Sequence, residues 1–229
     1  MQSFQHVTPP LRLFQGPDSL AQLGRELERL GSKRAVIVCG RSLSRDGAVI
    51  GQVLSGMGDR CAGVFAGVRA HSPAPAVREA AERLRQLDAD AVVAVGGGSA
   101  IVTARAASIL LAEKGDLAAL ATSRDERGAL RSPKLLAPKL PQLVVPTTPT
   151  TAMVKAGSAV FDTLAGERRA LFDPKTRAQA IFIHPDLANS APAALVIGSG
   201  LNTFALAIEG LMARAADPLA DAPVSYTHL

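Results

Sequence analysis

The chain has 229 residues, of which 48% are apolar, so it is long enough to bury a sizeable core. Aromatic residues make up 3%, and this scarcity of stacking surfaces argues against binding of single-stranded nucleic acid. The formal net charge of +5 comes from Arg residues scattered among Asp and Glu, a pattern typical of solvated helix faces. Cys39 and Cys61 fall in apolar, strand-like runs, which favours buried thiols in a reducing compartment.

Neither a membrane span nor a secretion signal is expected. No apolar run approaches the ~20 residues needed to cross a bilayer. The N-terminal segment MQSFQHVTPPLRLF lacks the apolar core of a signal peptide. We therefore expect a soluble, cytoplasmic protein without nucleic-acid or membrane partners.

Short apolar runs alternate with amphipathic segments along most of the chain. The predicted strands are 11–14, 35–39, 61–65, 91–95, 143–145 and 180–183, and the predicted helices are 20–30, 43–54 and 73–87. Segments 156–161 and 168–172 are typical of a strand pair joined by a turn, and 113–142 is a polar surface segment. This alternation with short connections predicts an α/β fold with a Rossmann-like parallel sheet.

From about residue 192 to 212 the pattern becomes helical only. We place a domain boundary near 184–187. An α/β domain is thus expected over 1–186, and the start of an all-helical domain over 187–223.

Gly96, Gly97 and Gly98 separate the predicted strand 91–95 from a helix, for which Ser99 is the predicted N-cap. Bare glycines let backbone N–H groups approach a phosphate, and the helix dipole favours its negative charge. The pattern predicts a site for a nucleotide or another phosphate ligand. A tight strand–helix turn is the alternative, because the spacing does not match G-x-G-x-x-G.

Threonines cluster after the predicted strand 143–145, in the segment PTTPTT at 146–151. In open α/β sheets, ligands bind outside the carboxyl ends of strands, where hydroxyls can donate to phosphate or ribose oxygens. The segment is therefore a second candidate for nucleotide contacts, with a Thr/Pro-rich turn as the alternative.

In order and spacing, several segments resemble the iron-containing alcohol dehydrogenase family, which has a dehydroquinate synthase-like fold, and in particular its maleylacetate reductase branch. These segments are TPP, FQGPDSLAQLG, VVAVGGGSAI, VVPTT, IFIHPDLANSAP and GSGLNTFALAIEGLMARAADPLADA, and they cover nearly the whole chain. The resemblance implies NAD(P) on an N-terminal α/β domain, a helical C-terminal domain and a metal ion between them. It also implies pyrophosphate contacts from Gly96, Gly97, Gly98 and Ser99, and nucleotide contacts from Thr147, Thr148 and Thr151.

The chain departs from the family pattern at several positions that are expected to contact the cofactor. The family motif GGGSxxD ends here in Val102, and PTTxGTGSE continues as PTTPTTAMV, which makes that loop stiffer and less polar. Where the family often carries an Asp that pairs with the adenosine ribose, this chain has Gly40, followed by Arg41. The absence of that carboxylate and the presence of a nearby Arg favour binding of the 2′-phosphate of NADP, so we expect a preference for NADP over NAD. A solvated Arg41 is the alternative.

The largest departure from the family pattern is at the positions of the metal ligands. The family motif resembles GMDALTHAIEAY, whose Asp and His lie four apart on one helix face and reach one ion. Asn202 and Leu206 occupy these positions here. Because Asn offers a neutral oxygen and Leu offers no ligand, the iron or zinc ion typical of the family is not expected. Asn at the first position is similar to the maleylacetate reductase branch, which usually keeps the His. Glu209 is expected to be a helix-surface or helix-pairing carboxylate.

No catalytic residue is identified from the sequence. Without a metal, a Lys, Arg, His or water-bound donor must polarise the carbonyl oxygen, and Lys155 is a candidate. A solvent-facing strand residue is the alternative for Lys155. His71, on the loop after the third predicted strand, is a candidate cofactor contact, whereas His184 is expected to be a boundary-turn residue.

The last six residues, VSYTHL at 224–229, do not resemble the family. They match one reading frame of a common sequencing adapter, so we expect a C-terminally truncated frame with an artefactual tail. Tyr226 and His228 then carry no function. Truncation would leave Ile197, Leu201, Phe204, Ile208 and Leu211 exposed, which is an aggregation hazard.

The leading hypothesis is an NAD(P)-dependent oxidoreductase that transfers hydride between the nicotinamide and an alcohol or carbonyl substrate. A homodimer is expected for the full-length protein, and the truncated chain alone is expected to bind cofactor without turnover. One alternative is a maleylacetate reductase-like enzyme without metal. The other is a catalytically inactive nucleotide-binding relative.

Overall fold

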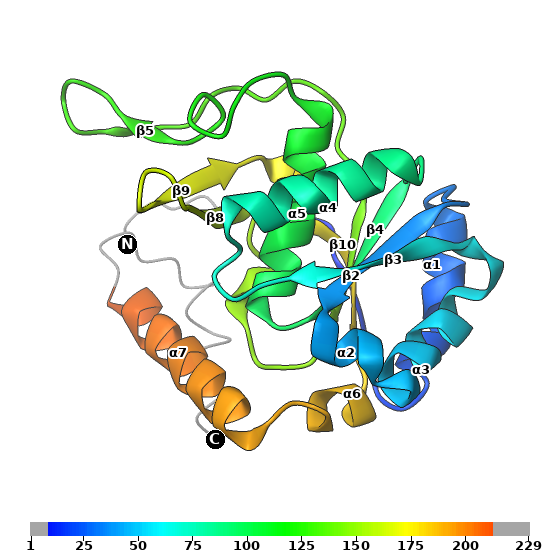
Figure 1. Cartoon of the computed structure of the whole chain (residues 1–229). Helices are drawn as coiled ribbons and strands as arrows, with labels where there is room; N and C mark the ends of the chain where they lie inside the picture. Colours follow the sequence, from blue (N-terminus) through cyan, green and yellow to red (C-terminus); the bar gives the residue numbers. More distant parts are fainter. Residues whose placement is uncertain (1–8, 213–229) are drawn as a thin grey trace.

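The computed structural model describes residues 9–212, and its centre is a six-stranded parallel sheet (Figure 1). Its strands, in spatial order, are β1 (Arg12–Gln15), β10 (Ala178–Ile183), β7 (Gln142–Pro146), β4 (Ala91–Gly96), β2 (Ala35–Gly40) and β3 (Cys61–Val68). Each predicted strand of this sheet is present, with small shifts at its ends. The predicted parallel α/β class is therefore confirmed.

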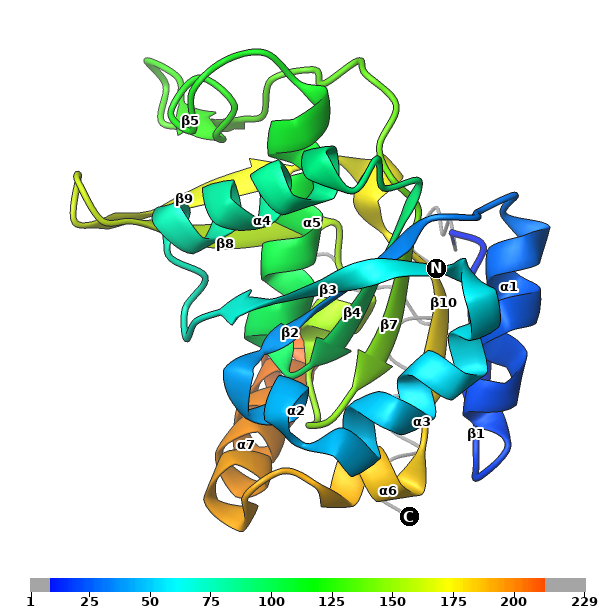
Figure 2. The ribbon, with the colours of Figure 1, turned by 45° about the vertical axis from the view of Figure 1, so that its right-hand side comes forward.

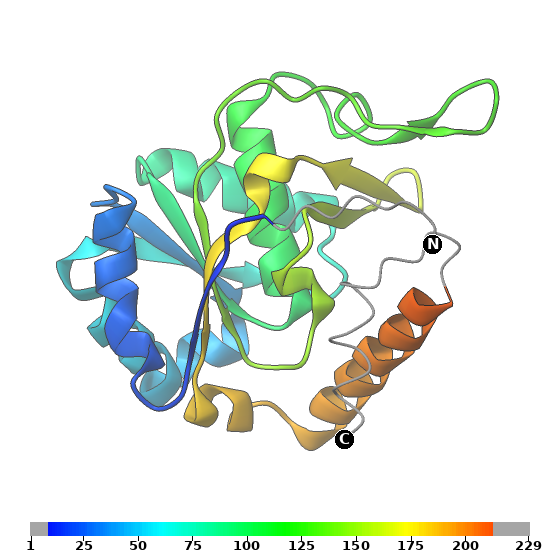
Figure 3. The ribbon, with the colours of Figure 1, turned by 180° about the vertical axis from the view of Figure 1, so that it is seen from behind.

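Helices cover both faces of the sheet (Figure 2). The longer ones are α1 (Leu23–Arg29), α3 (Gly47–Met57), α4 (Ala74–Gln86), α5 (Gly98–Ala112) and α7 (Ala193–Leu211). The shorter ones are η1 (Ser19–Gln22), α2 (Arg41–Arg45), η2 (Gly58–Arg60), η3 (Thr151–Met153), η4 (Pro174–Thr176) and α6 (Pro185–Asn189). Because α4 and α5 cover one face and α1 and α3 the other, the central strands are buried on both sides and are apolar except for Gln142 at the start of β7. Figure 3 shows the same layers from behind.

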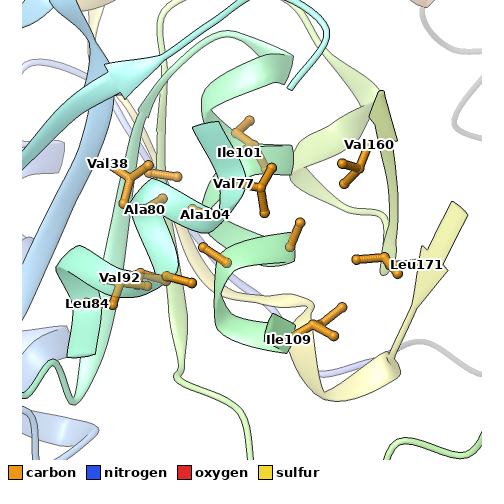
Figure 4. Close-up of a cluster of buried hydrophobic side chains, with 14 of the residues drawn as sticks. Val38, Val77, Ala80, Leu84, Val92, Ile101, Ala104, Ile109, Val160 and Leu171 are labelled. Carbon is orange, nitrogen blue, oxygen red and sulfur yellow. The ribbon is translucent and has the colours of Figure 1, made fainter. Parts of the chain in front are cut away.

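One of the two apolar cores lies between the sheet, α4 and α5 (Figure 4). Val77 and Ala80 of α4 pack with Ile101 and Ala104 of α5. The predicted strand pair is also confirmed, as the antiparallel hairpin β8 (Gly157–Asp162) and β9 (Glu167–Phe172). Its buried residues Val160 and Leu171 join the same core, so the hairpin is fixed to α5. In the polar segment 113–142, the short strands β5 (Ser123–Arg124) and β6 (Leu130–Arg131) pair with each other.

The predicted helix 43–54 is wrong as a single element. The chain forms α2 and α3 instead, separated at Asp46. The Asp46 Oδ1 atom accepts hydrogen bonds from the N–H groups of Ala48 (3.1 Å) and Val49 (3.2 Å). This N-cap satisfies two donors that a continuous helix would have bonded to its preceding turn, which is why Asp starts a new helix here.

Helix α7 corrects the expectation that no apolar segment approaches the length of a membrane span. It has 19 residues and a mean hydropathy of 1.5, which suffices by length and composition. The core helix of a soluble protein passes the same test when its partners cover it. The predicted exposure of its apolar face is confirmed, since Ile197 is 62% and Leu201 63% exposed. The predicted tail at 224–229, with Tyr226 and His228, lies outside the described residues.

Candidate functional site

The carboxyl ends of β2, β4 and β7 meet at one edge of the sheet (Figure 2). Gly96 at the end of β4 is in register with Pro146 of β7, and the Gly96 carbonyl accepts a hydrogen bond from Thr147 N–H at 3.2 Å. A cavity of about 860 Å³ opens at this edge. We call it the glycine–threonine cavity, and its lining includes Gly40, Gly96, Gly97, Gly98, Ser99, Thr147, Thr148 and Thr150.

Glycine is favoured at 96–98 because the turn after β4 and the threonine loop after β7 approach each other closely. Gly96 has φ +137°, a conformation that L side chains rarely adopt. A Cβ on Gly97 would lie 2.9 Å from Thr148 Oγ1, and a Cβ on Gly98 would lie 3.2 Å from Thr150 Oγ1. Any side chain at Gly97 or Gly98 would therefore fill the space between the two loops.

Ser99 is not the N-cap of α5, which corrects the sequence-based prediction. Gly97 takes that position with extended backbone, and the helix begins at Gly98. The Ser99 hydroxyl instead accepts a hydrogen bond from the N–H of His71 at 3.2 Å. The Ala100 N–H donates to the Gly97 carbonyl at 3.0 Å. Because no side chain caps α5, the N–H groups of Gly98 and Ser99 remain to donate to an anion in the cavity, and the 15-residue helix adds its dipole. These features fit a pyrophosphate.

A second cavity of about 420 Å³ is also lined by Ser99, and we call it the basic cavity. Its lining includes His71, Ser72, Gly98, Ser99, Val102, Thr150, Thr151, Lys155, Arg168, Asn202 and Leu206. Thr151 lines this cavity, whereas Thr147 and Thr148 line the glycine–threonine cavity. His71, Gly98, Ser99, Thr150 and Asn202 line both cavities, so the two are adjacent.

Of the two nucleotide contacts expected at the end of β2, one lines the glycine–threonine cavity and the other does not. Gly40 lines the glycine–threonine cavity. Arg41, the first residue of α2, is exposed and is not among the residues that line it. Asp46 does line the cavity, but its Oδ1 atom is engaged in capping α3.

The residues at the family's metal positions do not offer a metal-binding donor set. Asn202 and Leu206 lie one turn apart on α7, and both line the basic cavity. Within residues 9–212, no three His, Cys, Asp or Glu side chains lie close enough together to hold an ion. Glu209 is exposed, as predicted. A neutral amide and an alkyl side chain leave the described part of the chain without the anionic ligands that a divalent ion needs.

His184 and Cys39 have structural roles. His184 lies in the turn between β10 and α6, where it is the N-cap residue of α6 and its Nε2 lies 2.9 Å from the Pro17 carbonyl oxygen. Burial raises the pKa of the Cys39 thiol to about 11, which keeps it protonated and unreactive. Cys61 is only half-buried and is also a free thiol.

Arg105 holds the loop that lines the basic cavity, a role that the sequence did not predict. Its guanidinium is fully buried beneath the loop that carries Thr151 and Lys155. The Nη2 atom donates to the carbonyl of Ala152 at 2.6 Å, and Nη1 donates to that of Gly157 at 2.7 Å. Burial, and secondarily the charge of Arg177, lower the Arg105 pKa to about 10, so the side chain stays cationic at neutral pH. Its position inside an apolar helix pattern gave no indication of this role.

Comparisons with known proteins agree with this architecture. The model of the family described as iron-containing alcohol dehydrogenase matches residues 10–185. A maleylacetate reductase from Sphingobium indicum is 32% identical over 214 residues, which are 92% of this chain and 50% of that protein. The chain thus spans about half the length of this curated relative.

Solved structures have the same fold. The maleylacetate reductase of Rhizobium sp. strain MTP-10005 aligns with a TM-score of 0.76 at 26% identity, covering 98% of this chain and 55% of that one. A sulfoacetaldehyde reductase from Bifidobacterium kashiwanohense, solved in complex with NAD⁺, aligns with a TM-score of 0.84 at 20% identity. It covers 97% of this chain and 57% of that one, and at this identity the likeness concerns the fold alone.

Proposed function

Because the chain belongs to the iron-containing alcohol dehydrogenase family, we propose that it is the cofactor-binding part of an NAD(P)-dependent oxidoreductase acting on an alcohol or carbonyl substrate. The observation that carries this proposal is the glycine–threonine cavity. There the N-terminus of α5 has no side-chain cap, and a Cβ on Gly97 or Gly98 would crowd the hydroxyl of Thr148 or Thr150. We propose that 1–186 is the cofactor domain and that 187–223 begins a helical substrate domain.

In the proposed complex the pyrophosphate lies against Gly97, Gly98 and Ser99. Backbone N–H groups of the first turn of α5 donate to its oxygens, and the helix dipole stabilises its charge. Thr147 and Thr148, both buried at the cavity wall, supply hydroxyls for phosphate or ribose oxygens. The bound nicotinamide supplies the hydride, while the protein orients it and excludes water.

A preference for NADP over NAD forms part of the proposal. Gly40 lacks the carboxylate that would repel a 2′-phosphate, and Arg41 follows it at the first position of α2. Exposure leaves the Arg41 side chain free to turn toward the cavity mouth when the phosphate is present.

The reaction proposed here uses no metal held by Asn202 and Leu206, because these residues do not fit one. The carbonyl oxygen must then accept a hydrogen bond from another donor. Lys155 is the candidate, since it lines the basic cavity beside Asn202 and its exposed ammonium group carries three donors.

A catalytically inactive nucleotide-binding protein is the second candidate, and Leu206 at a metal position favours it. Metal analysis and NADPH oxidation against a panel of carbonyl compounds separate the two, using the longest reading frame that contains this sequence. Turnover in metal-free protein supports the reductase. Cofactor binding without turnover supports the inactive relative, whereas metal-dependent turnover contradicts our interpretation of Leu206. Gel filtration of the same protein tests the proposed homodimer.

A further inference from the structure

The basic cavity has a charge pattern that cofactor binding does not explain. Its wall carries the cationic side chains Lys155 and Arg168 together with the ring of His71. Every other lining residue within 9–212 is neutral, so the described part of the chain places no carboxylate in the cavity wall. Among the described residues, neither Lys155 nor Arg168 forms an ion pair, whereas the neighbouring Arg169 pairs with Asp162 and Glu167.

Arg168 is held toward the cavity by His71, although the two residues are 97 positions apart in the chain. The Arg168 Nη2 and His71 Nδ1 atoms lie 3.3 Å apart. Because a guanidinium has only donors, Nδ1 is the acceptor and the ring proton lies on Nε2. The pair therefore presents further N–H groups of Arg168 and one of His71, with no acceptor of its own.

The backbone beneath this pair is unusual. His71 and Ser72 both have positive φ, at 63° and 48°, which non-glycine residues rarely adopt. Hydrogen bonds fix the strained turn: the Ser72 hydroxyl donates to the Ser99 carbonyl at 3.1 Å, and the Ser72 carbonyl accepts from Phe161 N–H at 3.1 Å. The turn, α5 and the hairpin are thus joined into one rigid wall.

Resting on the proposed function, we propose that Arg168, Lys155 and His71 form a subsite for a carboxylate carried by the carbonyl substrate, with Arg168 as its specificity-determining residue. A planar guanidinium matches the two oxygens of a carboxylate, and an unpaired cation loses no internal partner when it binds one. The subsite adjoins Gly98 and Ser99, so the carboxylate would lie beside the cofactor rather than in its place.

Binding of a dicarboxylate probe tests the proposal. Succinate and its dimethyl ester are titrated calorimetrically into the protein saturated with NADPH, whose binding is measured separately by fluorescence. We expect succinate to bind at least about tenfold more tightly than the ester. The Arg168→Gln variant should lower the affinity for succinate at least about tenfold. Lys155→Met is expected to weaken succinate binding in the same direction, and Arg168→Lys to weaken it less than Arg168→Gln.

The matched control is Arg169→Gln, because Arg169 lies on the same strand but is already paired with acidic residues. It should leave succinate binding unchanged. Equal binding of acid and ester, or equal losses in the Arg168 and Arg169 variants, would overturn the proposal. Succinate or inorganic phosphate that binds only in competition with NADPH would place the anion in the cofactor cavity and also overturn it. Failure of NADPH itself to bind contradicts the proposed function instead.

Discussion

The hydroxyl oxygen of Thr148 lies 2.9 Å from the point where a Cβ on Gly97 would stand. The threonine loop after β7 and the glycine turn after β4 therefore approach as closely as glycine permits. This relationship joins Gly97 and Thr148, which are 51 positions apart in the chain, into one wall of the glycine–threonine cavity.

Substitution of Gly97 tests that wall. Gly97→Ala should weaken NADPH binding by at least roughly tenfold, about 1.4 kcal/mol, because its methyl group must displace the Thr148 hydroxyl or the ligand. Fluorescence titration measures the affinity. The control is Gly51→Ala inside α3, where a Cβ meets nothing within 4 Å, and it should leave the affinity unchanged. An unaltered affinity in Gly97→Ala would show that the cofactor binds elsewhere.

The metal positions on α7 give a gain-of-function prediction. The double variant Asn202→Asp, Leu206→His places two ligands one turn apart on the same helix, and it should bind Zn²⁺ more tightly than the wild-type chain. The wild-type chain should retain no stoichiometric iron or zinc after dialysis. Elemental analysis and zinc titration measure both quantities. Stoichiometric metal in the wild-type protein would contradict our account of Leu206.

Arg105 is predicted to stabilise the loop between η3 and β8. Arg105→Met removes the donors to the Ala152 and Gly157 carbonyls and should lower the free energy of unfolding by about 1–3 kcal/mol. Urea denaturation gives this value. Arg177→Met should cost less, because Arg177 makes a longer bond of 3.3 Å to the Val154 carbonyl at an exposed position. Equal losses in the two variants would argue against a special role for the buried guanidinium.

The buried cation Lys139 sets a pH dependence. It lies 3.1 Å from Asp173 Oδ2, and both side chains are almost fully buried. Burial alone would raise the Asp173 pKa, but the hydrogen bonds from the Lys175 N–H group and from Lys139 outweigh it and lower that pKa. A carboxyl group with a lowered folded pKa contributes stability above its unfolded pKa, near 3.9, and loses it as pH falls through the folded value.

Removing the Lys139 cation should therefore raise the pH at which the protein unfolds during acid titration. Circular dichroism during acid titration should show Lys139→Met unfolding at a higher pH than the wild type, because the buried Asp173 carboxylate then protonates more readily. The control is Lys134→Met, whose side chain is exposed. An unchanged midpoint in Lys139→Met would mean that this ion pair does not govern acid stability.

The sheet was predictable from the sequence because its central strands are buried on both faces and are therefore almost entirely apolar. The sequence also identified the glycine and threonine segments, since both follow directly from a buried strand. The helix break at Asp46 and the N-cap at Gly97 were not predicted. Each depends on which of several neighbouring residues takes the N-cap position, and local hydrogen bonding in the folded chain decides this. The pairing of His71 with Arg168 was beyond sequence reasoning, since only tertiary packing of the hairpin brings them together.

Cofactor binding to this chain is the most direct test of the central claim. Equilibrium titration of the purified protein with NADPH and NADH, followed by fluorescence, should show saturable binding of both and a smaller dissociation constant for NADPH. Arg41→Ala should remove that difference while leaving NADH binding in place. Absence of saturable binding by either nucleotide would contradict the assignment of the glycine–threonine cavity, and tighter binding of NADH would contradict the proposed preference for NADP.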